Sequence, residues 1–117
     1  MTTPVNLAAK LATFSEYWQP RIVATFDGND ILVVKALGEF VPHYHEDNDD
    51  GFLVLSGRLT IRMAEGDVTL GPSELSVVPR GVQHQPVAEE ETHLWLIEPT
   101  GTPNTGDGFT AAPRRTI

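Results

Sequence analysis

Residues 38–57 of the chain read GEFVPHYHEDNDDGFLVLSG, with two histidines separated by a single residue. On a β-strand, side chains at positions i and i+2 share a face, so we expect His43 and His45 to point the same way and Tyr44 to point the opposite way. Two imidazoles held side by side can offer two neutral nitrogens to one metal ion. The stretch therefore predicts a metal site on one face of a strand.

Two further residues are candidates for completing this site. Asp50 opens the next predicted strand, where an acid that faces back into a barrel could join the histidines. His84 follows the turn residues Pro79, Arg80 and Gly81, at the mouth of a later strand. Three imidazoles and a carboxylate form a mixed nitrogen and oxygen set that suits Fe, Mn, Ni, Cu or Zn and leaves positions open for a substrate. The alternative is that the alternating histidines lie on an exposed strand and bind nothing.

Beyond this stretch, most of the chain is a succession of short β-rich runs separated by turn residues. This spacing, with no helix between the runs, favours an antiparallel sandwich or barrel. One helix is expected before the runs, because Asn6 can cap it and Leu7, Leu11 and Phe14 form an apolar stripe. The predicted strands cover Ile22–Phe26, Ile31–Leu37, Phe52–Ser56, Leu59–Met63, Val68–Leu70, Leu75–Val78 and His93–Ile97.

The length of 117 residues supports a single domain. We expect residues 1–20 to form an N-terminal helical segment and residues 21–98 to form the β-barrel. Thirteen of the nineteen residues from 99 to 117 are Gly, Pro, Thr, Asn or Asp, which favours irregular structure. We therefore expect a C-terminal tail that drapes over the barrel or is partly disordered.

Composition limits the classes of partner. Sixteen acidic and eight basic residues give a formal net charge of −8, and such a surface repels nucleic acid and anionic lipid. The absence of cysteine excludes disulfides and thiolate metal ligands. Apolar runs are too short for a membrane helix, and the first residues lack the pattern of a signal peptide. We expect a soluble cytoplasmic domain with no nucleic-acid or membrane partner.

Two motifs resemble those of the cupin family. Residues 38–57 resemble the first cupin motif, which combines His-x-His with a following acid and flanking glycines. Residues 73–84, SELSVVPRGVQH, resemble the second motif, which ends in Pro-x-Gly-x-x-His. The chain looks most like the small single-domain cupins labelled mannose-6-phosphate-isomerase-like, also in residues 97–99 and 104–107. The resemblance implies an all-β fold, the cupin jelly-roll antiparallel β-barrel, with a short N-terminal helix.

The resemblance also implies a ligand set for one divalent transition metal, whose members are His43, His45, Asp50 and His84. The chain departs from the family pattern at this site, because Asp50 stands where glutamate is usual and its side chain is one methylene shorter. A glycine inside a strand often marks a bulge, so we expect a bulge at Gly51 to bring the shorter acid within reach. The alternative is that the fourth ligand is lost and water takes its place. Other departures from the pattern are the spacing of Gly38 from His43, Gly51 in place of a bulky apolar residue, Ser73 in place of glycine and Ala88 in place of a common asparagine.

Three residues are candidates for a substrate pocket. Phe52 and Val54 have the same strand parity as Asp50, so we expect them to line the barrel near the metal. Arg80 lies close to His84 in the sequence and could bind a carboxylate or phosphate, although an arginine in a surface turn is an equally good interpretation.

The resemblance leaves the reaction open, because cupins include isomerases, lyases, dioxygenases and binding proteins. One hypothesis is a metal-dependent enzyme that acts on a small polar metabolite such as a sugar or sugar acid. The alternatives are a module that binds a small molecule without catalysis and a metal-free structural cupin. We also expect a homodimer, in which the apolar stripe of the N-terminal helix and the strand Ile22–Phe26 cover an exposed sheet edge.

Overall fold

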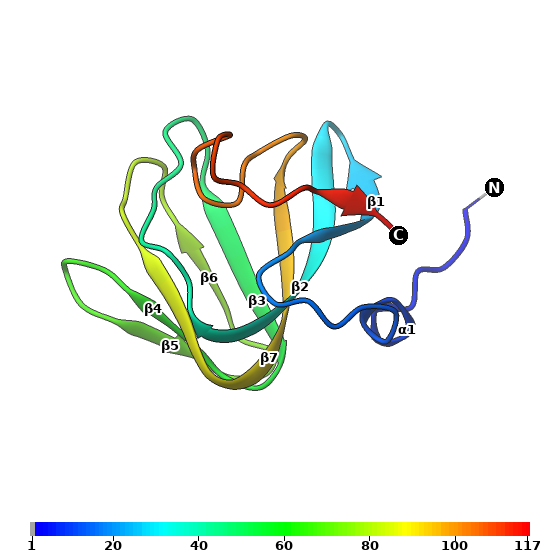
Figure 1. Ribbon diagram of the computed structural model, residues 1–117, viewed down its shortest axis with the longest axis horizontal. Helices are drawn as coiled ribbons and strands as arrows, with labels where there is room; N and C mark the ends of the chain where they lie inside the picture. The colour runs from blue at the N-terminus through cyan, green and yellow to red at the C-terminus, as the bar shows by residue number, and fades with distance from the viewer. Residues whose placement is uncertain (1) are drawn as a thin grey trace.

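The computed structural model describes residues 2–117, which form one short helix and eight strands (Figure 1). Helix α1 (Leu7–Leu11) is capped by Asn6, whose side chain accepts a hydrogen bond from the amide of Ala9. The strands are β1 (Arg21–Phe26), β2 (Asn29–Glu39), β3 (Asp50–Ser56), β4 (Leu59–Arg62), β5 (Val68–Leu70), β6 (Leu75–Val78), β7 (Gln85–Pro99) and β8 (Arg115–Thr116).

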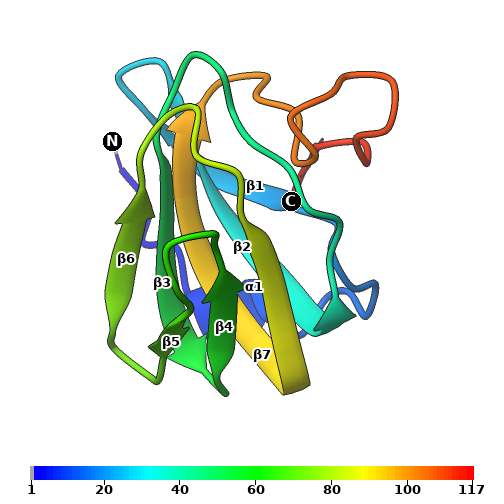
Figure 2. The same ribbon diagram turned by 90° about the vertical axis from the view of Figure 1, so that its left-hand side faces the viewer.

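The two longest strands, β2 and β7, organise the sheet. They pair antiparallel with each other over most of their length. Along its other edge, β7 pairs with two strands in succession. Its first half pairs with β4 and its second half with β3, so the sheet folds over into two facing layers (Figure 2). The β3–β4 turn lies against β7 at this change. A Cβ on Gly57, which has φ of 89°, would lie 2.5 Å from Thr92 Oγ1, so this position requires glycine.

The main hydrophobic core lies between the two layers. Because side chains alternate along a strand, one face of each strand supplies this core. It contains buried apolar residues from both layers, with partly buried residues packed around them. The buried members are Leu32, Val34, Ala36, Phe52, Val54, Leu59, Ile61, Leu70, Val78, Ala88, Leu94 and Leu96.

The jelly-roll arrangement of the strands is confirmed, but the sheet does not close into a barrel. Strand β5 pairs only with β4, and β6 pairs only with β3, so each leaves a free edge among residues 2–117. The expectation of a wholly antiparallel sheet is also wrong at one edge. Strand β8 runs parallel to β1, with Arg21 opposite Arg115 and Ile22 opposite Thr116. Part of the predicted tail therefore extends the sheet.

Helix α1 is shorter than the apolar stripe that predicts it. The helix ends at Leu11, and Phe14 lies beyond it in an irregular segment. The stripe packs on the outer face of its own sheet, where Leu11, Val23 and Val33 form a second buried cluster with Leu7 and Phe14 around it. The expected N-terminal helical segment is therefore mostly a non-helical connection that covers this face.

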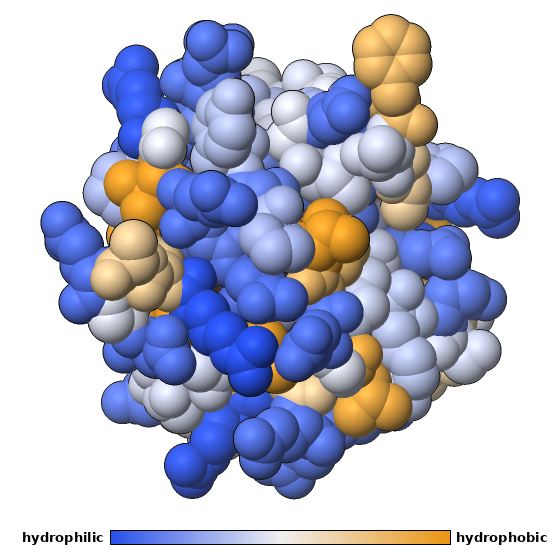
Figure 3. All heavy atoms as spheres, turned by 60° about the vertical axis from the view of Figure 1, so that its left-hand side comes forward, coloured by the Kyte–Doolittle hydropathy of each residue, from blue (hydrophilic) through white to orange (hydrophobic). Residues whose placement is uncertain are grey.

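The face shown in Figure 3 carries mainly hydrophilic residues, with hydrophobic ones in separate small patches. The exposed apolar side chains include Leu75 and Val77 on β6, at 67% and 54% exposure. Within residues 2–117, no helix combines the length and the hydropathy that a membrane crossing requires.

Candidate metal centre

The three site histidines lie in two segments outside the long strands. His43 and His84 form an isolated antiparallel bridge, in which each backbone amide donates to the other's carbonyl, at 3.0 and 2.8 Å. The amide of Gly81 donates to the carbonyl of His45 at 2.8 Å. His43 and His45 are buried and Tyr44 is 52% exposed, so the predicted alternation is confirmed. Backbone pairing thus brings together two motifs that are far apart in the sequence.

Two of the imidazoles are oriented by their own loops. The Nδ1 atoms of His43 and His84 lie 2.9 Å from the carbonyl oxygens of Val41 and Val82, each two residues earlier in the chain. A hydrogen bond from Nδ1–H to a carbonyl fixes the tautomer and leaves the Nε2 lone pair available to a metal ion. The same local geometry therefore prepares both side chains as ligands.

Asp50, the first residue of β3, completes the cluster. Its Oδ2 atom lies 3.1 Å from His45 Nε2 and 3.2 Å from His84 Nε2. Ligand atoms that bind one ion at about 2.1 Å are about 3.0 Å apart in octahedral geometry and about 3.4 Å apart in tetrahedral geometry, and these separations lie between the two values. One potential ligand atom from each of the four residues lies within 4.8 Å of the others. The structure thus brings together all four predicted metal ligands.

The second carboxylate oxygen of Asp50 is unusual. Oδ1 is buried and has no hydrogen-bond partner among residues 2–117. Leaving a buried polar atom unpaired is costly, so such an atom requires an explanation. A cation bound between the imidazoles and the carboxylate would satisfy it, and the residues present therefore fit a metal ion.

The pKa shifts of His43 and Asp50 keep both side chains in the protonation states that can bind a metal ion. Burial lowers the pKa of His43 to about 4, only partly opposed by the hydrogen bond to Val41, so its imidazole is neutral near pH 7. Burial alone raises the pKa of Asp50. Hydrogen bonds with His45 and His84 outweigh this effect and hold the pKa of that carboxyl below its usual range.

The predicted bulge at Gly51 is wrong. Strand β3 pairs in regular register with β6 from Asp50 to Leu53, and the register shifts only between Val54 and Ser56. Asp50 therefore reaches the histidines without a local bulge.

Ser73, which stands where the cupin motif has glycine, keeps a backbone conformation that favours glycine, with φ of 70°.

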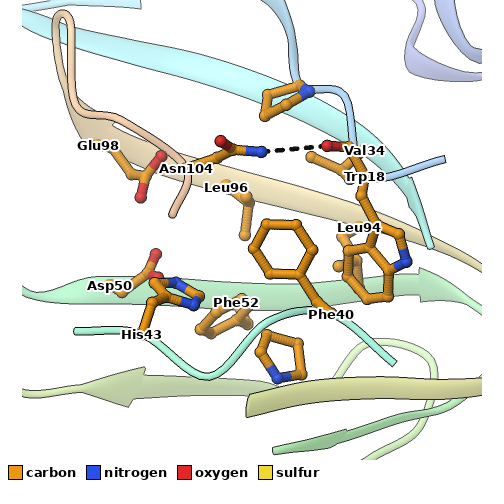
Figure 4. A pocket seen from close by; sticks show the side chains of 12 residues that line it. Trp18, Val34, Phe40, His43, Asp50, Phe52, Leu94, Leu96, Glu98 and Asn104 are labelled. Atoms are coloured by element: carbon orange, nitrogen blue, oxygen red, sulfur yellow. Dashed lines mark hydrogen bonds between the residues drawn. The ribbon is translucent and has the colours of Figure 1, made fainter. Parts of the chain in front are cut away.

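A pocket opens next to the cluster (Figure 4). It is narrow, with a cavity volume of about 30 Å³, and His43, Asp50 and Glu98 lie at one end. The other residues of its lining are mainly apolar, namely Trp18, Pro20, Val34, Phe40, Phe52, Pro86, Leu94, Leu96 and Asn104. The site therefore combines a group of potential metal ligands with a mostly apolar cavity.

Of the three predicted pocket residues, one lines the pocket and two do not. Phe52 lines the pocket, and its ring centroid lies 5.9 Å from that of His84. Val54 is fully buried in the core and does not contribute to the pocket lining. Arg80 is exposed in a turn, where its backbone amide donates to Asp49 Oδ1 at 2.9 Å, and it is also absent from the lining.

A buried carboxyl at the site, Glu98, was not predicted. It lies at the end of β7 on the same parity as Leu94 and Leu96, and its Oε2 is 3.8 Å from His45 Nε2. An acidic residue at a strand position whose side chain faces inward, among apolar residues, is a signal that could have identified it. Burial and the negative charge of Asp50 raise the pKa of Glu98 well above its usual value.

Glu98 is held by an arginine from the C-terminal segment. Arg114 Nη2 donates to Glu98 Oε1 at 2.8 Å, and its Nη1 donates to the buried Asp30 at 3.3 Å. Thr100 also donates to Asp30, at 3.1 Å. Nothing in the local sequence around Arg114 indicates this role, because the partners are 16 and 84 residues away.

Comparisons with known proteins give a family match and several similar folds. Residues 31–98, more than half of the chain, match the profile of the family described as Cupin domain. A comparison with curated proteins gives no significant match.

Three solved structures illustrate the structural similarity. A cupin-2 domain containing protein from Shewanella frigidimarina is 39% identical, with a TM-score of 0.80 over 81% of this chain and 93% of that one. A protein from Neisseria meningitidis is 34% identical, with a TM-score of 0.76 over 84% and 100% of the two chains. Hydroquinone 1,2-dioxygenase from Sphingomonas sp. TTNP3, in complex with 4-nitrophenol, is 19% identical, with a TM-score of 0.72 over 83% and 32%. The last shows a shared fold alone.

Proposed function

The chain belongs to the cupin family, and on that premise we propose that it binds one divalent transition metal through His43, His45, Asp50 and His84 and presents it to a small molecule in the adjacent pocket. The ion would be Fe, Mn, Ni, Cu or Zn, all of which accept nitrogen and oxygen ligands. The mannose-6-phosphate-isomerase-like subtype within the family is part of this proposal.

The unpaired Oδ1 of Asp50 carries the proposal. The atom is buried beside three imidazoles, in a cluster that has no lysine or arginine at hydrogen-bond distance from Asp50 among the described residues. In the metal-free protein, a proton that the Glu98 carboxyl shares with Asp50 can compensate part of this charge. A metal ion would do this with the geometry that the side chains already have.

The residues of the chain would have separate tasks. His43 and His84 are oriented by carbonyl oxygens of their own loops, so little ordering is needed when they bind. The apolar lining would exclude water from the bound molecule and hold it beside the ligand set. A bound divalent ion supplies Lewis acidity at this point, which polarises an oxygen of the molecule that contacts it.

The class of reaction is a further part of the proposal. A metal-dependent isomerase, lyase or dioxygenase is compatible with this site, and a sugar or sugar acid is the metabolite class that the sequence predicts. A small-molecule-binding module without catalysis is the alternative. The described neighbours include a dioxygenase, but its 19% identity supports a common fold and nothing more specific.

Metal analysis tests the proposal. The protein is purified without a histidine tag, incubated in turn with Fe, Mn, Ni, Cu and Zn, desalted and analysed by mass spectrometry. We expect about one equivalent of at least one of these metals per chain. Less than about a tenth of an equivalent of each metal would contradict the proposal and would favour the metal-free alternative.

A matched pair of variants identifies the ligands. His43→Ala should lose most of the bound metal, whereas His93→Ala should keep it. His93 is the suitable control because it lies on the outer side of β7 and its ring pairs with Glu91 at 2.9 Å. Equal loss in both variants would place the metal on the surface instead.

A further inference from the structure

The cavity beside the metal ligands is too small for a metabolite in this structure. Its volume is about 30 Å³, which holds about one or two waters, whereas ligand pockets measure about 300–1,000 Å³. A second and more exposed space of about 290 Å³, the outer hollow, is also lined by His43. The polar side chains of Glu46 and Gln83 belong to its lining. A small molecule at the proposed metal therefore needs room that only the two spaces together provide.

Consecutive residues of the C-terminal segment line the two spaces. Asn104 lines the narrow cavity, and the next three residues, Thr105, Gly106 and Asp107, line the outer hollow. This short piece of chain is therefore the wall between them. A movement of the wall would join the two spaces beside His43.

The loop that contains this wall is anchored at both ends. Thr100 and Arg114 both donate to the buried carboxylate of Asp30, at 3.1 and 3.3 Å. The Thr100 amide also donates to the carbonyl of Gly28 at 3.0 Å, and Arg114 donates to Glu98 at 2.8 Å. A surface loop whose two ends meet in this way is an Ω-loop, a type that is frequently functional. The residues between these anchors can change position while the sheet keeps its structure.

Within this loop, residues 103–112 are stabilised mainly by their own hydrogen bonds. Asn104 Oδ1 accepts from the amide of Ala112 at 3.0 Å, which closes the loop. The carbonyl of Asp107 accepts from the amides of Thr110 and Ala111, at 3.1 and 3.0 Å. Bonds of this kind stay intact when the loop moves as one unit.

Two contacts hold the loop against the site. Asn104 Nδ2 donates to the carbonyl of Trp18 at 3.1 Å, a bond that Figure 4 shows at the side of the pocket. Among residues 2–117, no other hydrogen bond joins residues 103–112 to the rest of the chain. The backbone of Gly106 also lies against Tyr44, whose carbonyl oxygen a Cβ at Gly106 would overlap. In Figure 2 the loop is accordingly seen beside the segment that joins β2 to β3.

We infer that residues 103–112 form a lid on the metal centre, and that a small molecule enters when the lid lifts from Trp18 and Tyr44 and joins the outer hollow to the cavity. The inference rests on the proposed function, because the lid covers the proposed metal site. The joined site offers Glu46 and Gln83 to a metabolite with several hydroxyls, each of which needs a partner when it leaves water.

Two variants open the lid by different means. Asn104→Asp keeps the oxygen that closes the loop but replaces the donor to Trp18 with a second acceptor. Gly106→Ala introduces the overlap with Tyr44 and changes no charge. Gly101→Ala is the matched control, because Gly101 also has a positive φ, 83° against 74° at Gly106, but nothing within 4 Å of an added Cβ.

Acrylamide quenching of Trp18 measures the opening in metal-free protein. The chain has two tryptophans, so Trp95→Phe leaves Trp18, in the cavity wall, as the only indole for all variants. Losing one hydrogen bond shifts the ratio of open to closed lid about fivefold. We therefore expect the bimolecular quenching constant to rise at least about twofold in Asn104→Asp and in Gly106→Ala and to change by less than about 20% in Gly101→Ala.

Hydrogen exchange distinguishes a lid from local unfolding. The amides of Thr110 and Ala111, which are bonded inside the loop, should exchange at the same rate in Asn104→Asp as in the original protein. Faster exchange at both amides would overturn the inference, because the loop would then unfold instead of lifting as one unit.

The outcomes distinguish the lid from the proposed function, with metal uptake measured separately for each variant. Unchanged quenching in Asn104→Asp and Gly106→Ala, or an equal rise in Gly101→Ala, would overturn the lid even if the protein binds metal. Protein that takes up no metal but shows the expected quenching would refute the metal proposal and support the movable loop. If one of the two opening variants does not fold, the other decides.

Discussion

At the residue scale, Asp50 is a buried acid with few hydrogen-bond partners. Its carboxylate is buried, its Oδ2 faces two imidazoles, and its Oδ1 lacks a partner among residues 2–117. Asp49, one position earlier, is exposed and accepts a hydrogen bond from the amide of Arg80. Two neighbouring aspartates thus have different surroundings, because strand β3 begins between them.

This difference gives a prediction for metal affinity. Asp50→Ala should weaken binding by at least about 10–100-fold, the loss seen when partners outside the direct ligands are removed. Asp49→Ala should leave the affinity nearly unchanged. Competition with a fluorescent chelator measures both variants. Similar losses in the two would mean that the acidic loop attracts the ion only through its overall charge.

The pKa of His43 predicts how stability depends on pH in the metal-free protein. Burial lowers the pKa of the folded state to about 4, whereas the unfolded chain has the ordinary value of about 6.5. Unfolding therefore takes up a proton between these values, so the free energy of unfolding falls as the pH falls from about 6.5 to about 4. Thermal melts in the presence of a chelator measure this decline.

The control for this prediction is His43→Gln, which lacks the titrating group. Its stability should decline less than that of the original protein over the same pH interval. The raised pKa of Glu98 acts in the opposite direction, but it is present in both proteins and cancels in their difference. Identical pH profiles would contradict the assignment to His43.

At the scale of elements, the bend of the sheet depends on a close contact between β7 and the β3–β4 turn. Gly57 and Thr92 meet there, and Thr92 Oγ1 donates to the carbonyl of Arg58 and accepts from its amide, both at 3.0 Å. The turn closes at the place where β7 passes from β4 to β3. Because this contact lies where β7 passes from one layer to the other, it stabilises both layers.

Gly57→Ala should therefore destabilise the fold by about 2–4 kcal/mol, from the strain of a positive φ and the clash with Thr92. Gly28→Ala is a matched control, because Gly28 has φ of 77° but nothing within 4 Å of an added Cβ. It should cost only about 1 kcal/mol. Urea denaturation compares the two, and equal costs would show that the clash is relieved by movement.

The C-terminal segment is attached to the site by the side chain of Arg114. The guanidinium of this arginine contacts both Asp30 and Glu98, which are almost fully buried. Removing one partner of a buried ion pair leaves uncompensated charge. Arg114→Met should therefore lower the free energy of unfolding by about 3 kcal/mol, measured by urea denaturation.

Arg115→Met tests whether this effect is specific. Arg115 is the next residue, is exposed and lies in β8. Its replacement should change stability by less than about 0.5 kcal/mol. A large loss in both variants would mean that the short strand, and not the buried ion pair, stabilises the C-terminal segment.

At the scale of the whole molecule, the expected homodimer stays a prediction, as does the cytoplasmic location. The apolar stripe of the N-terminal helix packs on its own sheet, and β8 occupies the edge of β1. These segments are therefore already covered within one chain. The free edge of β6, with Leu75 and Val77 exposed, is an apolar surface that is available to a second copy.

Light scattering measures the oligomeric state. We expect a mass near twice the 12.8 kDa of one chain at micromolar concentration. Each chain carries a formal charge of −8, so added salt should screen the repulsion and increase the dimer fraction. A mass near 12.8 kDa at every salt concentration would contradict the prediction.

The sequence by itself determined the strands, their order and the ligand candidates. Period-two alternation and turn residues are local properties, so seven strands could be placed from the sequence. The largest error is in β7, because its first half lacks a continuous apolar pattern. The parity of His43 and His45 is equally local. Recognition of His84 and Asp50 as their partners came from family resemblance.

Only the tertiary structure decided how these parts meet. The bridge between His43 and His84, the pairing of β8 with β1, and the ion pairs of Arg114 join residues that are distant in the chain. The pocket likewise combines Trp18, Phe52, Glu98 and Asn104 from four separate segments. Local propensity carries no information about such contacts, because their energies arise only when packing has brought the segments together.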